Sequence, residues 1–176
     1  MAVLHYQFEA IHPFSDGNGR TGRVLNILYL LESKLLDLPV LYLSRYIIEN
    51  KSDYYVGLRK VTENGEWEDW IIYMLEAVEQ SAVKARARIL AIRSAMQNAV
   101  EKARLGMKSG YSYELIELAF RQPYIRINAL VENNIAQRAT ASNYLKELER
   151  LEILQSVRSG RDVMYLNLPL LQALSD

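Results

Sequence analysis

Residues 12–23 read His-Pro-Phe-Ser-Asp-Gly-Asn-Gly-Arg-Thr-Gly-Arg, and this segment is the basis for predicting the fold and the chemistry of the chain. The apolar run of residues 24–31 follows with helical spacing, so the segment is predicted to end where a helix begins. Its glycines let backbone amides turn inward, and a helix start adds unpaired N–H groups and the positive end of the helix dipole. Such a loop is predicted to bind an anion.

The charged side chains of this segment suit a magnesium nucleotide. A bare phosphate would repel Asp16, so we expect Asp16 to hold Mg²⁺, which bridges carboxylates and phosphates. Arg20 and Arg23 are three residues apart, on one face of the predicted first helical turn, and guanidinium groups suit phosphate oxygens. His12 is the group that can move a proton near neutral pH. The segment is therefore predicted to bring nucleotide, metal and base together.

The pattern His-x-Phe-x-Asp-Gly-Asn-Gly-Arg-x-x-Arg of residues 12–23 resembles the signature of Fic-domain proteins, with every spacing kept. Fic proteins transfer AMP from ATP to a hydroxyl group of a target protein, so the resemblance implies a protein adenylyltransferase that uses ATP and Mg²⁺. It implies that His12 is the catalytic base, which takes the proton of a Ser, Thr or Tyr hydroxyl as that oxygen attacks the α-phosphate. It implies that Asp16 holds the metal. The implied ATP-binding residues are Asp16, Gly17, Asn18, Gly19, Arg20, Thr21, Gly22, Arg23 and Tyr54.

The roles expected within this set differ. Gly17 and Gly19 fit an anion-binding nest, in which Asn18 can add a side-chain donor. The resemblance places Arg23 at the γ-phosphate end of ATP and Arg20 at the neighbouring phosphates. Gly19 and Arg23 also separate this sequence from a related toxin branch that phosphorylates its targets, because that branch has lysine at the position of Gly19 and lacks the last arginine. These two residues therefore favour AMP transfer.

Tyr54, Gly22 and His5 each have a structural interpretation. The family commonly presents a tyrosine from the helix of Tyr54 to the nucleoside, and core packing is the alternative; both stay open at this point. Gly22, as a small residue, is expected to allow close packing. His5 lies two helical turns before His12, and two histidines at that spacing with no third partner make a poor zinc site. We therefore expect His5 to be structural.

The composition limits the class of protein. The chain has 176 residues, of which 50% are hydrophobic, enough for one domain and a small second one. Lys+Arg and Asp+Glu are both 21, so the overall charge favours neither nucleic acid nor a charged membrane as a partner. The sequence has no cysteine, and no apolar run reaches the roughly 18 residues that a membrane helix needs. We expect a cytoplasmic protein with no membrane partner.

The first part of the chain is predicted to consist of short helices. They are expected at residues 2–11, 20–34, 45–49 and 53–65. Leu4, Phe8 and Ile11 share one face of the first helix, and Phe14 is expected to insert into the core and anchor the loop. Ser44 is expected to cap the third helix.

A long helix is predicted from Trp67 to Gly106. Its apolar residues follow alternating steps of four and three, which is a heptad pattern. They are Ile71, Leu75, Val78, Ala82, Ala85, Ile89, Ile92, Met96, Ala99 and Ala103. We expect residues 71–78 to pack along their own domain. For the rest of the helix, packing onto the next domain and pairing with a second copy of the chain both stay open.

The C-terminal part is predicted to be a separate domain, residues 106–176, after a first domain of residues 1–105. Helices are expected at residues 113–120, 125–133 and 140–151, the last capped by Thr140, and a hairpin at residues 154–166 that turns at 159–161. Three helices and a terminal hairpin resemble a winged helix-turn-helix, such as the C-terminal domain of many bacterial Fic proteins. Residues 140–148 would be its recognition helix.

The charge of this second domain bears on a second hypothesis, in which the chain is a DNA-binding or protein-binding regulator with an incomplete Fic core. Residues 106–176 contain eight Lys or Arg and eight Asp or Glu, so the domain lacks the usual excess of positive charge for nucleic acid. Arg158 and Arg161 on the hairpin could still form a local patch. We expect a protein partner, either the target or a second copy in a homodimer, ahead of DNA.

The resemblance also predicts what precedes the motif in Fic proteins, namely several helices and a β-hairpin flap that holds the target segment. This chain begins eleven residues before His12. We expect either a fragment or a shortened protein, with an intact phosphate loop. The predicted fold is therefore mainly α: a partial Fic core, a long connecting helix and a small winged helix-turn-helix domain.

Overall fold

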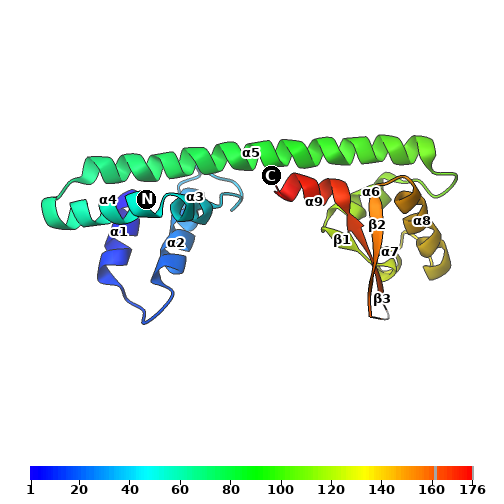
Figure 1. Cartoon of the computed structure of the whole chain (residues 1–176), viewed down its shortest axis with the longest axis horizontal. Coiled ribbons are helices and arrows are strands. Elements are labelled where there is room, and N and C mark those ends of the chain that lie inside the picture. The colour runs from blue at the N-terminus through cyan, green and yellow to red at the C-terminus, as the bar shows by residue number, and fades with distance from the viewer. Residues whose placement is uncertain (161, 176) are drawn as a thin grey trace. The chain divides into compact units, whose positions relative to one another are not determined.

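The computed structural model describes residues 1–160 and 162–175, and it confirms a mainly α-helical fold (Figure 1). The elements in chain order are α1 (Ala2–Ile11), α2 (Asn18–Glu32), α3 (Leu43–Glu49), α4 (Lys51–Asn64), α5 (Trp67–Gly106), α6 (Tyr113–Phe120), β1 (Tyr124–Ile125), α7 (Ile127–Glu132), α8 (Arg138–Arg150), β2 (Leu154–Ser159), β3 (Asp162–Asn167) and α9 (Leu168–Ser175). The chain divides into two compact units, unit 1 (residues 1–86) and unit 2 (residues 87–176). The division lies within α5, whereas the sequence placed a domain boundary at its C-terminal end. None of the described helices is both long enough and apolar enough to cross a bilayer.

Unit 1 contains the motif at the turn between two adjacent helices. Figure 1 shows α1 and α2 side by side, joined by residues 12–17. The first helix ends at His12, whose backbone is left-handed with φ of 49°, and Pro13 follows. The second begins after Gly17, which has φ of 85°. Glycine suits this N-cap position because a side chain is disfavoured at such a φ.

The core of unit 1 is aromatic. It is formed by Ile47, Tyr54, Val61, Trp70, Tyr73 and Met74. Trp70 is fully buried, its indole N–H donates to the carbonyl oxygen of Ala2 at 3.0 Å, and its ring stacks on His5 with centroids 6.0 Å apart. The N-terminal helix is thus tied to α5 through His5 and Trp70.

The predicted apolar face of α1 is wrong. Leu4 and Ile11 are exposed, while His5 is completely buried. The helix turns this way because His5 finds polar partners inside unit 1, as described below, and stacks on Trp70. Phe14 is also not inserted into the core: it is 50% exposed and contacts Phe8 with ring centroids 6.2 Å apart. Phe14 thus packs on α1 at the surface and does not anchor the loop in the core.

Both predicted helix caps are wrong as well. The N-cap of α3 is Tyr42, and Ser44 lies inside the helix, where its hydroxyl accepts a hydrogen bond from Arg23. The N-cap of α8 is Gln137, and Thr140 is an exposed residue of the first turn. In each case the helix starts two residues earlier than expected, and its N-cap residue makes no side-chain capping hydrogen bond.

The long helix α5 has the predicted bounds, but its first half buries a different face. Ile71 and Leu75 are exposed, and the buried residues are Trp70, Tyr73, Met74, Ala77 and Ser81. The indole of Trp70 fits against Gly57, where a Cβ atom would lie only 3.0 Å from the ring, and this contact sets the rotation of the helix. At the other end, Ala99 and Ala103 are buried in unit 2, as the predicted pattern requires.

Unit 2 combines helices with a small antiparallel sheet. The strand order is β1-β3-β2, and the hairpin of β2 and β3 pairs Gln155 with Leu166 and Val157 with Met164. This confirms the predicted hairpin, although Arg161 lies outside the described residues. The core is formed mainly by α6, α8 and the strands around Leu115, Ile116 and Leu145. Asn167 is fully buried; its side chain donates to the carbonyl of Ala119 and accepts from the N–H of Leu170, which fixes the start of α9.

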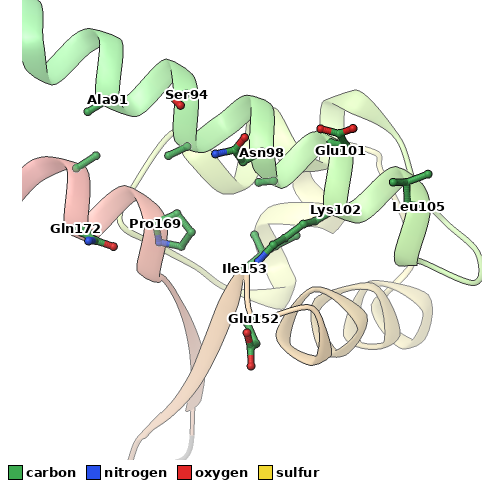
Figure 2. A pocket seen from close by; sticks show the side chains of 13 residues that line it. Ala91, Ser94, Asn98, Glu101, Lys102, Leu105, Glu152, Ile153, Pro169 and Gln172 are labelled. Carbon is green, nitrogen blue, oxygen red and sulfur yellow. The ribbon is translucent and has the colours of Figure 1, made fainter.

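A groove of about 670 Å³ lies in unit 2 between the C-terminal half of α5 and α9. Figure 2 shows Asn98 and Lys102 of α5 on one side and Pro169 and Gln172 of α9 on the other. Small residues of α5, such as Ala91 and Ser94, line its floor.

Candidate active site

The loop between α1 and α2 is closed by Asn18. The side-chain oxygen of Asn18 accepts the backbone N–H of Phe14 at 3.0 Å, and its side-chain nitrogen donates to the carbonyl of Phe14 at 2.6 Å. Asn18 itself is buried. The side chain predicted to donate to an anion is therefore engaged with the backbone, where it holds residues 14–18 in a tight turn.

Asp16 lies at the tip of this turn, exposed to solvent. One carboxylate oxygen accepts the N–H of Gly17 at 2.6 Å, and the other accepts from the guanidinium of Arg20 at 3.2 Å. The side chains of Arg20 and Asp16 are 75% and 89% exposed, so this ion pair contributes little to stability. The carboxylate can therefore exchange Arg20 for another cation at little cost.

Both arginines of the motif lie over its glycines. A Cβ atom at Gly17 would be 3.4 Å from Nη2 of Arg20, and one at Gly19 would be 3.2 Å from Nη1 of Arg23. The Nε of Arg23 donates to the hydroxyl of Ser44 at 2.8 Å, which fixes its guanidinium from α3. The two positive groups predicted to share one face are thus both beside the start of α2, and the motif did not indicate Ser44 as a support.

The first turn of α2 completes the polar surface. Its first N–H groups have no partner within the helix, and they lie at the positive end of the helix dipole. Thr21 closes the turn, because both its N–H and its hydroxyl donate to the carbonyl of Gly17, at 2.9 and 3.1 Å. Thr21 is therefore a support of the loop backbone.

His12 is exposed at the end of α1. Its backbone N–H donates to the carbonyl of Phe8 at 3.1 Å, so the residue caps the helix while its side chain lies at the solvent side of the loop. Glu9, one turn earlier, has a carboxyl oxygen that is buried without a hydrogen-bond partner among the described residues. Burial raises the pKa of Glu9, and the charges of His12 and Arg23 partly offset this.

Beneath the loop, His5 joins three helices, as expected for a structural residue. Its Nε2 lies 2.9 Å from the hydroxyl of Tyr54 on α4, and its Nδ1 lies 3.1 Å from the side-chain nitrogen of Asn26 on α2. Burial lowers the pKa of His5. A hydrogen bond with the Gly22 backbone acts to raise this pKa, and the positive charge of Arg23 acts to lower it. The neutral imidazole is therefore the stable form inside unit 1.

Gly22 lets α1 and α2 approach each other. A Cβ atom at this position would lie 2.6 Å from a carboxyl oxygen of Glu9 and 2.9 Å from Cε1 of His5. The prediction that Gly22 serves close packing is confirmed. The sequence analysis did not predict a role for Glu9 or Asn26. Glu9 lies one helical turn from both His5 and His12, and Asn26 lies one turn after Gly22.

Tyr54 does not lie at the loop. It is 5% exposed, its hydroxyl bonds to His5, and its ring packs among Trp70 and Tyr73. Of the two readings left open for Tyr54, this position favours core packing. Its neighbour Tyr55 is exposed, with the ammonium of Lys51 5.8 Å from its ring centroid.

A cavity of about 450 Å³ adjoins the arginines. Arg20 and Arg23 form its polar edge, and its remaining wall is mostly apolar. That wall is made by Val24, Ile27 and Leu28 of α2 and by Pro39, Leu41, Tyr42, Leu43 and Ser44. Space for a ligand therefore lies directly beside the two guanidinium groups.

The residues of the loop fit a metal ion that is already bound to a nucleotide. In the described part of the chain, no group of three or more acidic or histidine side chains could hold a metal ion. Asp16 offers a single exposed carboxylate. Mg²⁺ is commonly bound through one or two carboxylates together with substrate phosphates, so Asp16 suits Mg²⁺ that is already bound to a nucleotide.

Comparison with known proteins agrees with this geometry. Residues 1–30 match the model of the Fic/DOC family, and residues 95–170 match the model of the C-terminal domain of SoFic-like protein adenylyltransferases. Residues 1–30 are thus a Fic segment, and residues 95–170 are similar to the C-terminal domain of SoFic-like proteins. The chain is 34% identical over 80 residues to protein adenylyltransferase fic-1 of Caenorhabditis elegans; this alignment covers 46% of the chain and 14% of the relative. It is 47% identical over 61 residues to a probable protein adenylyltransferase of Aquifex aeolicus, which covers 35% of the chain and 17% of the relative.

The chain therefore spans less than a fifth of the length of these curated relatives. The match to the Fic/DOC model includes the whole of residues 12–23, with His12, Asp16 and both arginines.

Proposed function

We propose that residues 12–23 bind ATP with Mg²⁺, and that the chain transfers AMP to a hydroxyl group of a target protein with His12 as general base. The observation that carries the proposal is the position of the Arg20 and Arg23 guanidinium groups over Gly17 and Gly19, at the start of the helix that follows the loop from His12. Two positive groups, free N–H donors and one proton acceptor within a single loop are what phosphoryl chemistry requires. The similarity to proteins named as protein adenylyltransferases supports the same reaction.

In this proposal the first turn of α2 and the two arginines bind the phosphates. Arg23, fixed by Ser44, holds the γ-phosphate end, and Arg20 turns from Asp16 to the neighbouring phosphates. Gly17 and Gly19 leave room for phosphate oxygens to reach the backbone. Asp16 holds the metal ion, which would neutralise phosphate charge when bound.

The chemical step then follows from these positions. The hydroxyl oxygen of the target attacks the α-phosphorus, the bond from that phosphorus to the bridging oxygen breaks, and pyrophosphate leaves. His12 takes the hydroxyl proton, because its side chain is the exposed base at the edge of the loop. The products are an adenylylated side chain, pyrophosphate and a proton on His12 that passes to solvent.

We further propose a compartment for the reaction, a class of target protein and a fold class for unit 2. The cytoplasm, which supplies ATP, is the compartment that we propose for the reaction, and the partner is a protein with an accessible Ser, Thr or Tyr. Unit 2 has the element order of a winged helix-turn-helix: α6, α7 and α8 followed by the hairpin of β2 and β3. We propose that it is a winged-helix domain.

The proposal is tested by ATP binding and by mass spectrometry. We expect calorimetry to detect ATP binding that increases with Mg²⁺, and Arg23→Ala to weaken it. Arg59→Ala removes an exposed positive charge of α4 and is the matched control. Incubation with ATP and cell extract should add the mass of one AMP group to a target protein. Unchanged ATP binding in Arg23→Ala, or no binding by the intact chain, would contradict the proposal.

A further inference from the structure

The charges of residues 106–176 are balanced in number but separated in space. Glu147 and Glu149, in the second half of α8, both have partners within the unit. Glu147 accepts from the guanidinium of Arg150 at 2.9 Å, and Glu149 accepts the backbone N–H of Ser156 at 2.8 Å. These hydrogen bonds lower the pKa of both carboxyl groups. Their negative charge is thus compensated at one end of α8.

The basic side chains gather at the opposite end. Arg126, just before α7, has Nη2 3.4 Å from the sulfur of Met164 on β3. Arg138, at the start of α8, donates to the side-chain oxygen of Asn128 on α7 at 3.2 Å. These two contacts place the beginnings of α7 and α8 and the strand β3 next to one another. Figure 1 shows the hairpin of β2 and β3 extending beside α7.

The outer face of α8 is polar. Ala141, Leu145 and Leu148 are fully buried on its inner face, while Asn143 and Lys146 are exposed on the other. Arg158, on β2 of the hairpin, is exposed as well. The exposed residues in the first half of α8 are small or polar, so this part of the helix presents none of the large apolar anchors on which protein interfaces rely. It does offer side chains that pair with base edges and phosphates.

The order of α7 and α8, two short helices joined by a short connection, is that of a helix-turn-helix. Residues 133–137 join them, with Asn134 in a left-handed conformation at φ of 55°. In this motif the second helix enters the major groove of DNA with its N-terminal residues at the bases, and the first helix crosses the backbone. Arg138 and Asn143 of α8 would reach base edges, and Arg126 and Arg158 would reach phosphates on either side.

We propose that this basic face, made by Arg126, Arg138, Asn143 and Arg158, binds double-stranded DNA with α8 in the major groove. Glu132 lies beside this face, where it lines a hollow with Arg121 and Arg126; Arg121 is also 3.9 Å from Glu117. The even charge balance of residues 106–176 argued against nucleic acid. The positions of the basic side chains favour nucleic acid, because a DNA backbone contacts the charges on one face of a domain and not the net charge of the whole domain.

Fluorescence anisotropy with the full chain and a labelled mixed-sequence DNA duplex tests this interface. We expect binding at low salt, and the two phosphate contacts of Arg126 and Arg158 would give a slope of log affinity against log salt of about −1.8. Arg126→Ala, Arg138→Ala and Arg158→Ala should each weaken binding by about 3- to 10-fold. Lys102→Ala is the matched control, since it removes the same charge from the groove between α5 and α9 (Figure 2) and should leave binding unchanged.

Circular dichroism confirms that each variant is folded. No binding of the duplex by the intact chain at low salt would overturn the proposal. An equal loss of binding in Lys102→Ala and Arg138→Ala would also overturn it. Binding of single-stranded DNA or polyglutamate as tightly as the duplex would do the same, because these results describe a surface that binds any polyanion or a site for a protein. ATP binding by residues 12–23 is independent of every one of these outcomes.

Discussion

The Nε2 atom of His5 lies 2.9 Å from the hydroxyl oxygen of Tyr54, although 49 residues separate them in the chain. This hydrogen bond ties α1 to α4, and through Gly22 and Asn26 the same imidazole supports α2. The loop that begins at His12 is therefore held from below by a buried, neutral histidine.

The first consequence concerns Tyr54. We expect Tyr54→Phe to destabilise unit 1 by about 1–3 kcal/mol, because it leaves a buried nitrogen of His5 without a partner. Urea denaturation followed by tryptophan fluorescence measures this, since Trp70 packs on both residues. Tyr55→Phe removes the same hydroxyl from an exposed ring and should change the free energy of unfolding very little. Equal effects of the two variants would show that the bond to His5 contributes nothing.

A second consequence concerns the close approach of α1 and α2. Gly22→Ala should destabilise the chain by about 1–3 kcal/mol, because the added methyl group meets Glu9 and His5. Thermal denaturation measures the loss. Adding Glu9→Ala removes the nearer clash, so the double variant should recover part of the stability lost in Gly22→Ala. Strictly additive effects of the two substitutions would contradict this packing.

The dependence of stability on pH should reveal His5. Burial lowers its folded pKa, so the unfolded chain binds a proton at His5 where the folded chain does not. The stability that His5 contributes is therefore present above its unfolded pKa of about 6.5 and is lost as pH falls below that value. Denaturation between about pH 5 and pH 7.5 should show this loss in the native sequence relative to His5→Gln. Parallel pH profiles for the two proteins would show that His5 titrates alike in both states.

Ser44 should influence nucleotide binding through Arg23. We expect Ser44→Ala to weaken ATP binding about 3- to 10-fold, the range of one ordinary hydrogen bond, because the Arg23 guanidinium loses the group that fixes it but keeps its charge. Calorimetry measures the affinity, and Ser33→Ala, an exposed serine that follows α2, is the control. An unchanged affinity in Ser44→Ala would mean that Arg23 does not need this support.

Local signals explain what the sequence predicted well. Pro13 and the glycines after it set the end of α1 and the start of α2, and the hairpin of unit 2 follows from the turn residues near Gly160. Long-range contacts explain the errors. Ser44 reads as a cap from its neighbours in sequence, yet its partner is Arg23, 21 residues away. The buried face of α5 depends on how Trp70 fits Gly57, and α1 buries His5 because Tyr54 and Asn26 provide partners that no local pattern reveals.

The most direct test of the proposed AMP transfer compares ATP labelled at the α-phosphate with ATP labelled at the γ-phosphate. With Mg²⁺ and cell extract, we expect label from the α-position alone to appear on protein, and His12→Ala to abolish it while retaining ATP binding. Label transferred from the γ-position, or undiminished α-label with His12→Ala, would contradict adenylyl transfer with His12 as the base.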